Sequence, residues 1–408
     1  MSGRALLIGA GSTRSSARST AFLAAALSLF GLLLVGSVGD GALGGGEPYG
    51  YARKQAFFIA VAAAAAFFTS RFDYRRLLRL APWILGGTWA LLIGVLFAGE
   101  EQMGARRWFD VPGVGHLQPS EIAKLTLIVW CGAYAVGRGE RIRAFWTGAA
   151  PGLLGVAVTA GLVLAEKDLG TTLLLAVIGA VSLFVSGARL VHLMPPIAMG
   201  APALIIVMSG KFAYIRDRLE IYRKGFQDRS ATGQVDQALR ALGSGGWFGR
   251  GFGDARSHLG WVPQNHNDFI LAAVGEQTGF VGAAAVLTAF VLIFLHGMRI
   301  AAASKDRFGF TLAFGGSFLI ALQAAVNVAV ATNVVPPKGI NLPFVSYGGS
   351  SMILLGACVG LVCSVARVAA AEEDAEAARA AEASATPSPE ESVAPDAAPA
   401  SALAARAA

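Results

Sequence analysis

Charged side chains are scarce in this chain of 408 residues. Asp, Glu, Lys and Arg make up 14% of it, whereas a soluble domain carries about 25%. Hydrophobic residues reach 55%, and the mean hydropathy is +0.58. These values argue against a water-soluble enzyme and against a disordered chain. They favour a membrane protein.

Cysteine and histidine are also rare. The three cysteines, Cys131, Cys358 and Cys363, lie in apolar stretches, which predicts neither a disulfide framework nor a metal site. The five histidines are scattered and form no ligand pattern. We therefore predict no metal ligands. Glycine is abundant, with 51 residues, but it lacks the three-residue period of collagen.

Ten long apolar runs predict the fold. A bilayer core needs about 20 apolar residues per helix, and backbone polar groups in lipid must bond internally. No alternation typical of a barrel is present. We therefore predict an all-α, polytopic membrane protein with about ten transmembrane helices. The predicted spans are residues 21–38, 55–70, 81–98, 120–136, 148–165, 170–187, 189–209, 268–296, 308–335 and 345–369.

Basic residues predict the orientation of the chain. The net charge of +7 would suggest nucleic acid in a soluble protein, but in a membrane protein it usually orients loops. If the spans alternate, the arginines of the N-terminus and of the loops near 71–79, 138–143 and 299–307 share one side. The positive-inside rule makes that side cytoplasmic, with both chain ends. The other side then holds one large extracytoplasmic loop, residues 210–267, and shorter loops near 99–119 and 334–344.

Composition divides the chain into three parts. Residues 1–20 form a cytoplasmic N-terminal segment, and residues 21–370 form the membrane domain. Residues 371–408 are rich in Ala, Glu, Pro and Ser and too poor in large apolar groups to build a core, which predicts a disordered cytoplasmic tail. The first part of this tail, Glu372 to Glu382, is compatible with a prolonged last helix.

Polar side chains at membrane depth are costly and indicate function. Glu121 and Lys124 lie three residues apart after a favourable helix start, so they share a face and can pair. Such a pair either locks helix packing or forms a polar wall of a substrate cavity. The turn at 166–171, with Asp168, is either simply solvated or part of the same site.

Residues 243–253 are rich in glycine and include Arg250. Their backbone amides could hold phosphate oxygens beside this arginine, or the glycines could serve close packing against membrane helices. The stretch lacks the Gly-Lys-Ser/Thr ending of a nucleotide-binding loop, which argues against an ATPase.

Asp268 stands where the large loop enters an apolar segment. Partial desolvation there would raise the pKa of its carboxyl and make it a better base. The alternative is an N-cap of the eighth span. Downstream, prolines and glycines between 336 and 351 predict non-helical backbone, which at membrane depth is tolerated only inside protein or beside a wet cavity. Polar Gln323, Asn327 and Thr332 in the ninth span point the same way.

Several of these segments together resemble one family, the SEDS proteins (FtsW, RodA and SpoVE), and the division-type FtsW more than RodA. Glu166-Lys167 departs from the Gln-Pro usual before Asp168. In family order over roughly residues 20–370, the matching motifs are Gly104-Ala105-x-Arg107-Trp108, Gln118-Pro119-Ser120-Glu121-x-x-Lys124, Asp168-Leu169-Gly170-Thr171, Gly243-Ser244-Gly245-Gly246-x-Phe248-Gly249-x-Gly251, His266-x-Asp268-Phe269-Ile270 and Leu342 to Ser351.

The resemblance implies an inverting glycosyltransferase that polymerises lipid II and releases undecaprenyl pyrophosphate, for septal or lateral cell wall synthesis. Asp268 would be the general base for the acceptor hydroxyl, an effect worth on the order of 10²–10⁴-fold. Arg250, Arg256 or a divalent cation (Mg²⁺ or Mn²⁺) would stabilise the departing pyrophosphate. The residues expected to bind substrate or shape its site also include Glu121, Lys124, Asp168, Trp108, Arg107, Lys338, Ser346 and Ser350.

The resemblance also implies a place in the bacterial inner membrane and partners there. These partners are a class B penicillin-binding protein and other membrane proteins of the division or elongation machinery; no nucleic acid is expected. Two rival functions remain open. A lipid II flippase should show inverted repeats with broken helices at the midplane, and the sequence shows no convincing repeat. A non-catalytic scaffold of the division machinery leaves Asp268 unexplained.

Overall fold

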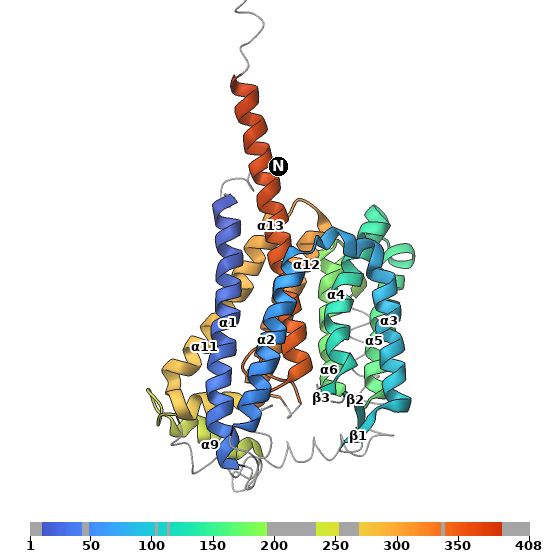
Figure 1. The fold of residues 1–408 in the computed structure, drawn as a ribbon. Coiled ribbons are helices and arrows are strands. Elements are labelled where there is room, and N and C mark those ends of the chain that lie inside the picture. Colours follow the sequence, from blue (N-terminus) through green and yellow to red (C-terminus); the bar gives the residue numbers. More distant parts are fainter. Residues whose placement is uncertain are drawn as a thin grey trace, which may run out of the picture.

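The structure is a computed structural model that describes residues 10–42, 49–102, 105–111, 115–193, 234–252, 269–335 and 339–385. Within them the chain is mostly helical (Figure 1). The helices are α1 (Ala10–Ala42), α2 (Gly50–Arg71), α3 (Leu77–Ala98), α4 (Pro119–Arg138), α5 (Ala150–Ala165), α6 (Leu169–Val185), α9 (Gln234–Ser244), α11 (Ile270–Ala303), α12 (Arg307–Ala331) and α13 (Gly349–Ala385). Short helical turns η1 (Tyr74–Arg76), η2 (Gly139–Arg143) and η3 (Phe145–Ala149) connect some of them.

The prediction of an all-α, polytopic membrane protein is confirmed. Seven stretches of helix in the described part of the chain are long and apolar enough to cross a membrane, and α6 is a shorter apolar helix. Nine of the ten predicted spans coincide with a described helix. The predicted span 189–209 lies mostly outside the described residues, and so does most of the predicted loop 210–267, of which 234–252 are described.

The first and last helices extend beyond the predicted membrane domain. α1 begins at Ala10 rather than near 21, and α13 continues to Ala385, in line with the prolonged last helix. The two extensions contact each other: Arg14 pairs with Asp374, and Thr13 and Ser16 on α1 are buried. Hydrophobicity alone marks the apolar part of a helix, so it misses such polar extensions. Residues 1–9 and 386–408 lie outside the described part.

A small antiparallel sheet occupies the loop near 99–119, where the sequence predicted no regular structure. Strands β1 (Glu100–Gln102), β2 (Ala105–Val111) and β3 (Gly115–Leu117) pair in the order β1-β2-β3. Aromatic and β-branched residues such as Trp108, Phe109 and Val111 favour extended backbone in β2. The sheet brings the Arg107-Trp108 motif over the ends of α4 and α3.

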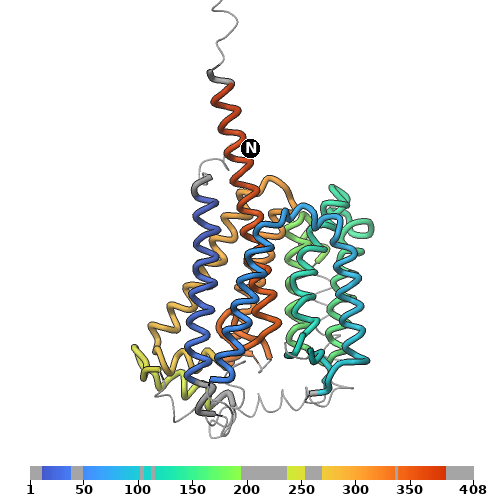
Figure 2. Tube along the Cα trace, in the orientation of Figure 1, coloured from blue at the N-terminus to red at the C-terminus, as the bar shows by residue number. Residues whose placement is uncertain are grey.

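The helices form two groups that share α4 and α6 (Figures 1 and 2). One core joins α1, α2, α11, α12 and α13 with parts of α4 and α6, and a second core joins α3, α4, α5 and α6. Within the first group α2 packs along α13, and α11 packs on both α12 and α1. Side chains on different faces of α4 enter the two cores, for example Ile128 the first and Leu127 the second. The two groups are therefore one continuous bundle.

Small residues allow the close contact between α2 and α13. A Cβ atom at Gly356 or Gly360 would collide with the backbone of Ala62 and Ala66. In a membrane, small residues at helix interfaces let backbones approach, because lipid supplies no hydrophobic driving force between helices. Thr69 adds a hydrogen bond of 3.1 Å from its Oγ1 to the carbonyl of Ala357. This contact fixes α13, which carries the last family motif at its start.

The bundle has two chemically different ends. The arginine end comprises η1, η2, the loop 304–306 and the C-terminal part of α13 (Figure 1). The hairpin end comprises β1–β3, the turn 166–168, α9 with residues 245–252, and the segment 339–348. The predicted cytoplasmic loops near 71–79, 138–143 and 299–307 fall at the arginine end, and the described parts of the predicted external loops fall at the hairpin end.

Candidate functional site

Every buried charged or amide side chain in the described part of the chain lies toward the hairpin end. Buried hydroxyl groups, in contrast, occur along the whole bundle, and many bond to the carbonyl four residues earlier. Charged and amide groups need partners that a single helix does not supply, so their concentration at one end marks that end for function. The nine side chains are Gln55, Glu121, Lys124, Glu166, Asp168, Glu276, Gln277, Gln323 and Asn327.

The predicted pair at the start of α4 is present. Lys124 Nζ donates a hydrogen bond of 2.6 Å to Glu121 Oε1, and the two side chains are only 2% and 11% exposed. Pro119 occupies the first turn of α4, where its missing N–H costs nothing. The second carboxylate oxygen of Glu121 has no hydrogen-bond partner among the described residues. The pair thus neutralises itself and leaves one acceptor free.

Asp168 is buried and caps α6, so the solvated alternative for this side chain is wrong. Its two carboxylate oxygens accept hydrogen bonds of 3.0 Å and 2.8 Å from the backbone N–H and the hydroxyl of Thr171. An aspartate at this position satisfies an amide that the helix leaves unpaired. The family motif Asp168-Leu169-Gly170-Thr171 therefore encodes a helix start.

The turn before Asp168 departs from the expected Gln-Pro in structure as well as in sequence. Lys167 has a φ of 61°, which the ring of proline does not permit. Glu166 is buried at 1% exposure, and neither carboxylate oxygen has a hydrogen-bond partner among the described residues. Burial, and then the nearby Asp168, raise the pKa of Glu166 to about 9, while Arg107 opposes this shift.

Arg107 connects the small sheet to this turn. Its Nε donates a hydrogen bond of 3.2 Å to the carbonyl of Glu166, and its Nη2 donates one of 2.6 Å to the carbonyl of Lys167. The guanidinium also lies 5.9 Å from the ring of Trp108, a cation–π distance. The two residues of the predicted motif thus have different surroundings: Arg107 holds the turn, and Trp108 is half-buried beside it.

Ser350 connects the same sheet to α13. Its hydroxyl donates a hydrogen bond of 2.8 Å to the carbonyl of His116 and accepts one of 3.2 Å from the N–H of Gln118. The hydroxyl of Ser346, four residues earlier, accepts a hydrogen bond of 2.8 Å from the N–H of Leu342. These serines were predicted to bind substrate, and the structure gives both of them backbone partners.

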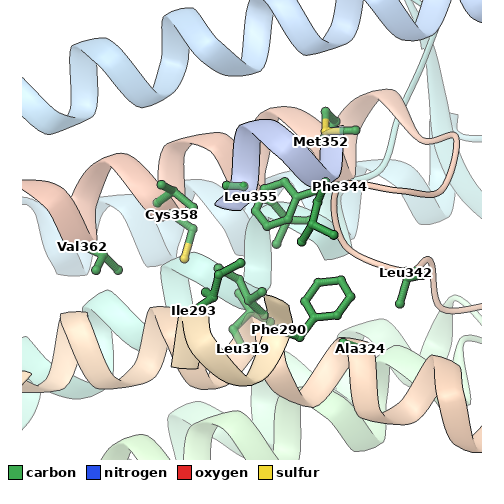
Figure 3. Packing of buried hydrophobic residues seen from close by; sticks show 14 of the residues in the cluster. Phe290, Ile293, Leu319, Ala324, Leu342, Phe344, Met352, Leu355, Cys358 and Val362 are labelled. Atoms are coloured by element: carbon green, nitrogen blue, oxygen red, sulfur yellow. The ribbon is translucent and has the colours of Figure 1, made fainter. Parts of the chain in front are cut away.

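The segment 339–348 is non-helical, as the prolines and glycines predicted, and it is anchored in the first core. Leu342 and Phe344 point between α11, α12 and α13, beside Phe290 and Leu355 (Figure 3). The side-chain amide of Asn327 donates a hydrogen bond of 2.8 Å to the carbonyl of Ile340. Irregular backbone at this depth is therefore satisfied by protein groups, as it must be in a membrane.

The glycine-rich residues 245–251 pack against a kink in α11, which favours the packing hypothesis for them. The N–H groups of Gly249, Arg250 and Gly251 donate to the carbonyls of Gly245, Glu276 and Gln277. A Cβ at Gly249 would collide with the Gln277 carbonyl, and Gly279 at the kink has a φ of 69°. These three amides are therefore committed to close packing and do not form a phosphate site.

Arg250 itself is exposed beside this packed turn. Its Nε donates a hydrogen bond of 3.1 Å to the carbonyl of Ser244, at the end of α9. Asp268, Arg256 and Lys338 lie outside the described residues, so their predicted roles stay predictions. Phe269, which follows Asp268 in the chain, is buried directly before α11.

Two buried amides were missed from the sequence. Gln55 in α2 donates a hydrogen bond of 3.4 Å to the carbonyl of Ser346. Gln277 in α11 accepts a hydrogen bond of 2.9 Å from the hydroxyl of Ser37. Gln55 directly follows Arg53-Lys54, and Gln277 directly follows Glu276, so neither stands out as a lone polar residue in an apolar run. Gln277 also joins α1 to the kinked part of α11.

Comparison with known proteins identifies the family. A family model described as "Cell cycle protein", for FtsW, RodA and SpoVE, matches residues 17–371. The chain belongs to this family. The match covers the whole helical bundle, from α1 into α13, so the resemblance seen in the motifs is confirmed.

Relatives and solved structures agree with the family. A protein of Trichlorobacter lovleyi named "Probable peptidoglycan glycosyltransferase FtsW" is 35% identical, covering 83% of this chain and 90% of its own. Stage V sporulation protein E of Bacillus subtilis is 32% identical, covering 79% and 88%. RodA of Thermus thermophilus is similar in structure, with a TM-score of 0.62 and 29% identity over 85% of this chain and 95% of its own.

A second solved structure is similar over more of the fold. It comes from work titled "Structural coordination of polymerization and crosslinking by a peptidoglycan synthase complex". Its TM-score is 0.71 at 29% identity, and the similarity covers 86% of this chain and 97% of that one. The helical architecture described above is therefore that of the family.

Proposed function

We propose that this chain is a peptidoglycan glycosyltransferase that polymerises lipid II into glycan strands and releases undecaprenyl pyrophosphate. The names of its relatives support this function. One structural observation carries it: all nine buried charged or amide side chains of the described part lie toward the hairpin end, and several belong to the family motifs. A cell wall polymerase needs such a polar region where lipid-linked sugars meet the membrane surface.

The hairpin end faces away from the cytoplasm in this proposal. Basic loops accumulate at the arginine end, and the positive-inside rule assigns such loops to the cytoplasm, together with both chain ends. The sugars of lipid II lie outside the cytoplasm while their lipid tail stays in the bilayer. A reaction between two such headgroups therefore needs its polar groups at the hairpin end.

Asp268 acts as the general base in the proposed reaction. Its carboxylate accepts the proton of the acceptor's sugar 4-hydroxyl while this oxygen bonds to the anomeric carbon of the donor. The bond from that carbon to the pyrophosphate breaks in the same displacement, which inverts the anomeric centre. General base catalysis contributes on the order of 10²–10⁴-fold to such a step.

Other residues hold the site around this step. Arg107 connects the small sheet to the turn before α6, Asp168 caps α6, and the Glu121–Lys124 pair neutralises two buried charges at the start of α4. Trp108 would contact substrate near the mouth of the site. Ser346 and Ser350 hold the segment before α13.

Basic groups would stabilise the departing pyrophosphate, and Arg250, Arg256 and Lys338 are the candidates. A divalent cation is the alternative. Loss of polymerisation in EDTA, restored by Mg²⁺ or Mn²⁺, would assign this role to the cation.

A class B penicillin-binding protein that cross-links the new strand is the proposed partner. The similar chain from a peptidoglycan synthase complex supports this assignment. Other membrane proteins of the division machinery would join them, as the similarity to proteins named FtsW suggests.

Reconstitution in liposomes with lipid II tests the function. We expect glycan polymer from the unaltered protein and none from Asp268→Ala. Asp268→Glu shifts the carboxylate by about one methylene, and displacement by about 1 Å costs about 10²-fold. The matched control is Asp110→Ala, an exposed aspartate on β2 at the same end, which should keep its activity.

The rival functions give different results in this assay. Lipid II that crosses the bilayer without polymer formation would indicate a flippase. Neither polymer nor transport, with a partner protein still bound, would indicate a scaffold. Normal polymer from Asp268→Ala would overturn the assignment of the base.

A further inference from the structure

Glu166 combines near-complete burial with the lack of a hydrogen-bond partner, among the described residues, for either carboxylate oxygen. It is 1% exposed, at the end of α5. A buried carboxylate without a partner is strongly unfavourable, and such a group usually neutralises itself by keeping a proton. The proposed reaction does not use this group.

The nearest cation does not neutralise Glu166. Arg107 binds the backbone of the turn, with Nε on the Glu166 carbonyl and Nη2 on the Lys167 carbonyl. If the Glu166 side chain were ionised, it would compete with these two neutral carbonyls for the guanidinium, because charge-assisted bonds are roughly twice as strong. The observed geometry is therefore the one expected for a neutral side chain.

Charges on the surrounding elements also disfavour ionisation. Asp168 is a second buried acid in the same turn, and it is committed to Thr171. Lys124 on α4 is paired with Glu121, and Lys167 is exposed. On β2, the other cation is Arg106, which pairs with Glu101. α3 carries its one charged residue, Arg79, at the arginine end.

We propose that Glu166 holds a proton at neutral pH and is a positioning residue, whose neutral side chain keeps Arg107 on the two carbonyls of the turn. Loss of that proton draws the guanidinium to the carboxylate and releases the turn that carries Asp168 and starts α6. The raised pKa of Glu166, about 9, agrees with this assignment. The effect on polymerisation rests on the proposed function, whereas the proton itself can be observed without it.

The sign of the effect on stability follows from the same proton. The free carboxyl has a pKa near 4.5, so between about 4.5 and about 9 the folded chain holds a proton that the unfolded chain lacks. Stability from this group therefore falls as pH rises through that interval and is constant above it. Glu166→Gln, which is neutral at every pH, removes this loss.

Infrared difference spectroscopy tests the proton directly. The unaltered protein is compared with Glu166→Gln in detergent from pH 6 to about 10. We expect the carbonyl stretch of a protonated carboxylic acid in the unaltered protein at pH 7, its loss at alkaline pH, and its absence from the variant. Glu140→Gln, an exposed glutamate at the arginine end, is the matched control and should keep the band. A carboxylate band from Glu166 already present at pH 7 would overturn the proposal.

The pH profile of lipid II polymerisation tests the positioning role. Above the pKa the protonated fraction falls about tenfold per pH unit, and we expect the activity of the unaltered protein to fall with it. Glu166→Gln should retain its activity across that alkaline range, relative to its own value at pH 7. If the polymerisation activity of both proteins falls in the same way with pH in the alkaline range, the positioning role is overturned. If neither protein makes polymer at any pH, the proposed function fails, while the infrared result still decides whether Glu166 holds the proton.

Discussion

Two glutamates at opposite ends of the bundle have opposite pKa shifts. At the arginine end Glu140 is exposed, and Arg307 and Arg143 lower the pKa of its carboxyl. At the hairpin end, burial and Asp168 raise the pKa of Glu166. Water solvates the first group whatever its charge, whereas the second must remain neutral or find a partner.

The same contrast extends to the other charged residues of the two ends. At the arginine end, α13 pairs with three other elements through exposed or half-buried residues, as Arg14–Asp374, Arg75–Glu372 and Lys305–Glu376 show. At the hairpin end the Glu121–Lys124 pair is almost fully buried. Exposed pairs are worth little, whereas breaking a buried pair is costly because one charge stays behind. Substitutions of similar chemistry should therefore have very different effects at the two ends.

The largest effect is expected for Lys124→Met. The substitution leaves the Glu121 carboxylate buried without its cation, and the loss of one partner of a buried pair costs about 3–5 kcal/mol. Thermal unfolding in detergent should show a large drop in stability. Removing both charges in Lys124→Met with Glu121→Leu should recover much of it but not the polymerisation activity. A double variant as unstable as the single one would show that the pair is not what stabilises α4.

A smaller effect is expected for Asp168→Ala. The cap of α6 is lost, which costs about 1 kcal/mol, and polymerisation should fall with it. Asp168→Asn keeps a side-chain oxygen for the Thr171 N–H and should recover both stability and activity, since both carboxylate oxygens are already committed to Thr171. A stable but inactive Asp168→Asn would mean that the charge itself acts on substrate.

The smallest effect is expected for Glu140→Gln. Its carboxylate is exposed and pairs with Arg307 at 2.8 Å, so salt screens the interaction. The melting temperature should change by less than about 1 °C at neutral pH, since an exposed pair contributes little. Any small loss should disappear at low pH, where the unaltered carboxyl is also neutral. A large drop in the melting temperature would show that exposed pairs at the arginine end stabilise the protein as much as the buried pair at the hairpin end.

The helical bundle was predictable because each apolar run is long enough to span a bilayer, and lipid leaves few alternatives for the backbone. The prolonged last helix was also anticipated, over Glu372 to Glu382, but the polar start of α1 was not. α1 starts within a Ser-rich stretch, where Arg14 pairs with Asp374 of α13, and apolar periodicity does not reveal such a contact. The three-stranded sheet was missed for the same reason, since its pairing depends on contacts between short loop segments.

The candidate site was predictable where spacing decides geometry. Glu121 and Lys124 pair because residues three apart share a helical face. The partners of Arg107 could not be predicted, since they are backbone carbonyls about 60 residues away in the chain. The burial of Glu166 could not be predicted either, because a charged residue in a short turn is usually solvated.

Photo-cross-linking of lipid II tests most directly whether the hairpin end is the reaction end. A photoreactive phenylalanine is placed at Trp108 on β2 or at Trp146 in η3, which is exposed at the arginine end. Each protein is then illuminated with lipid II that carries a labelled headgroup, with and without unlabelled competitor. We expect a competable cross-link at position 108 and none at 146. Cross-linking at 146 alone would place the sugars at the arginine end and overturn the assignment of the hairpin end to the reaction.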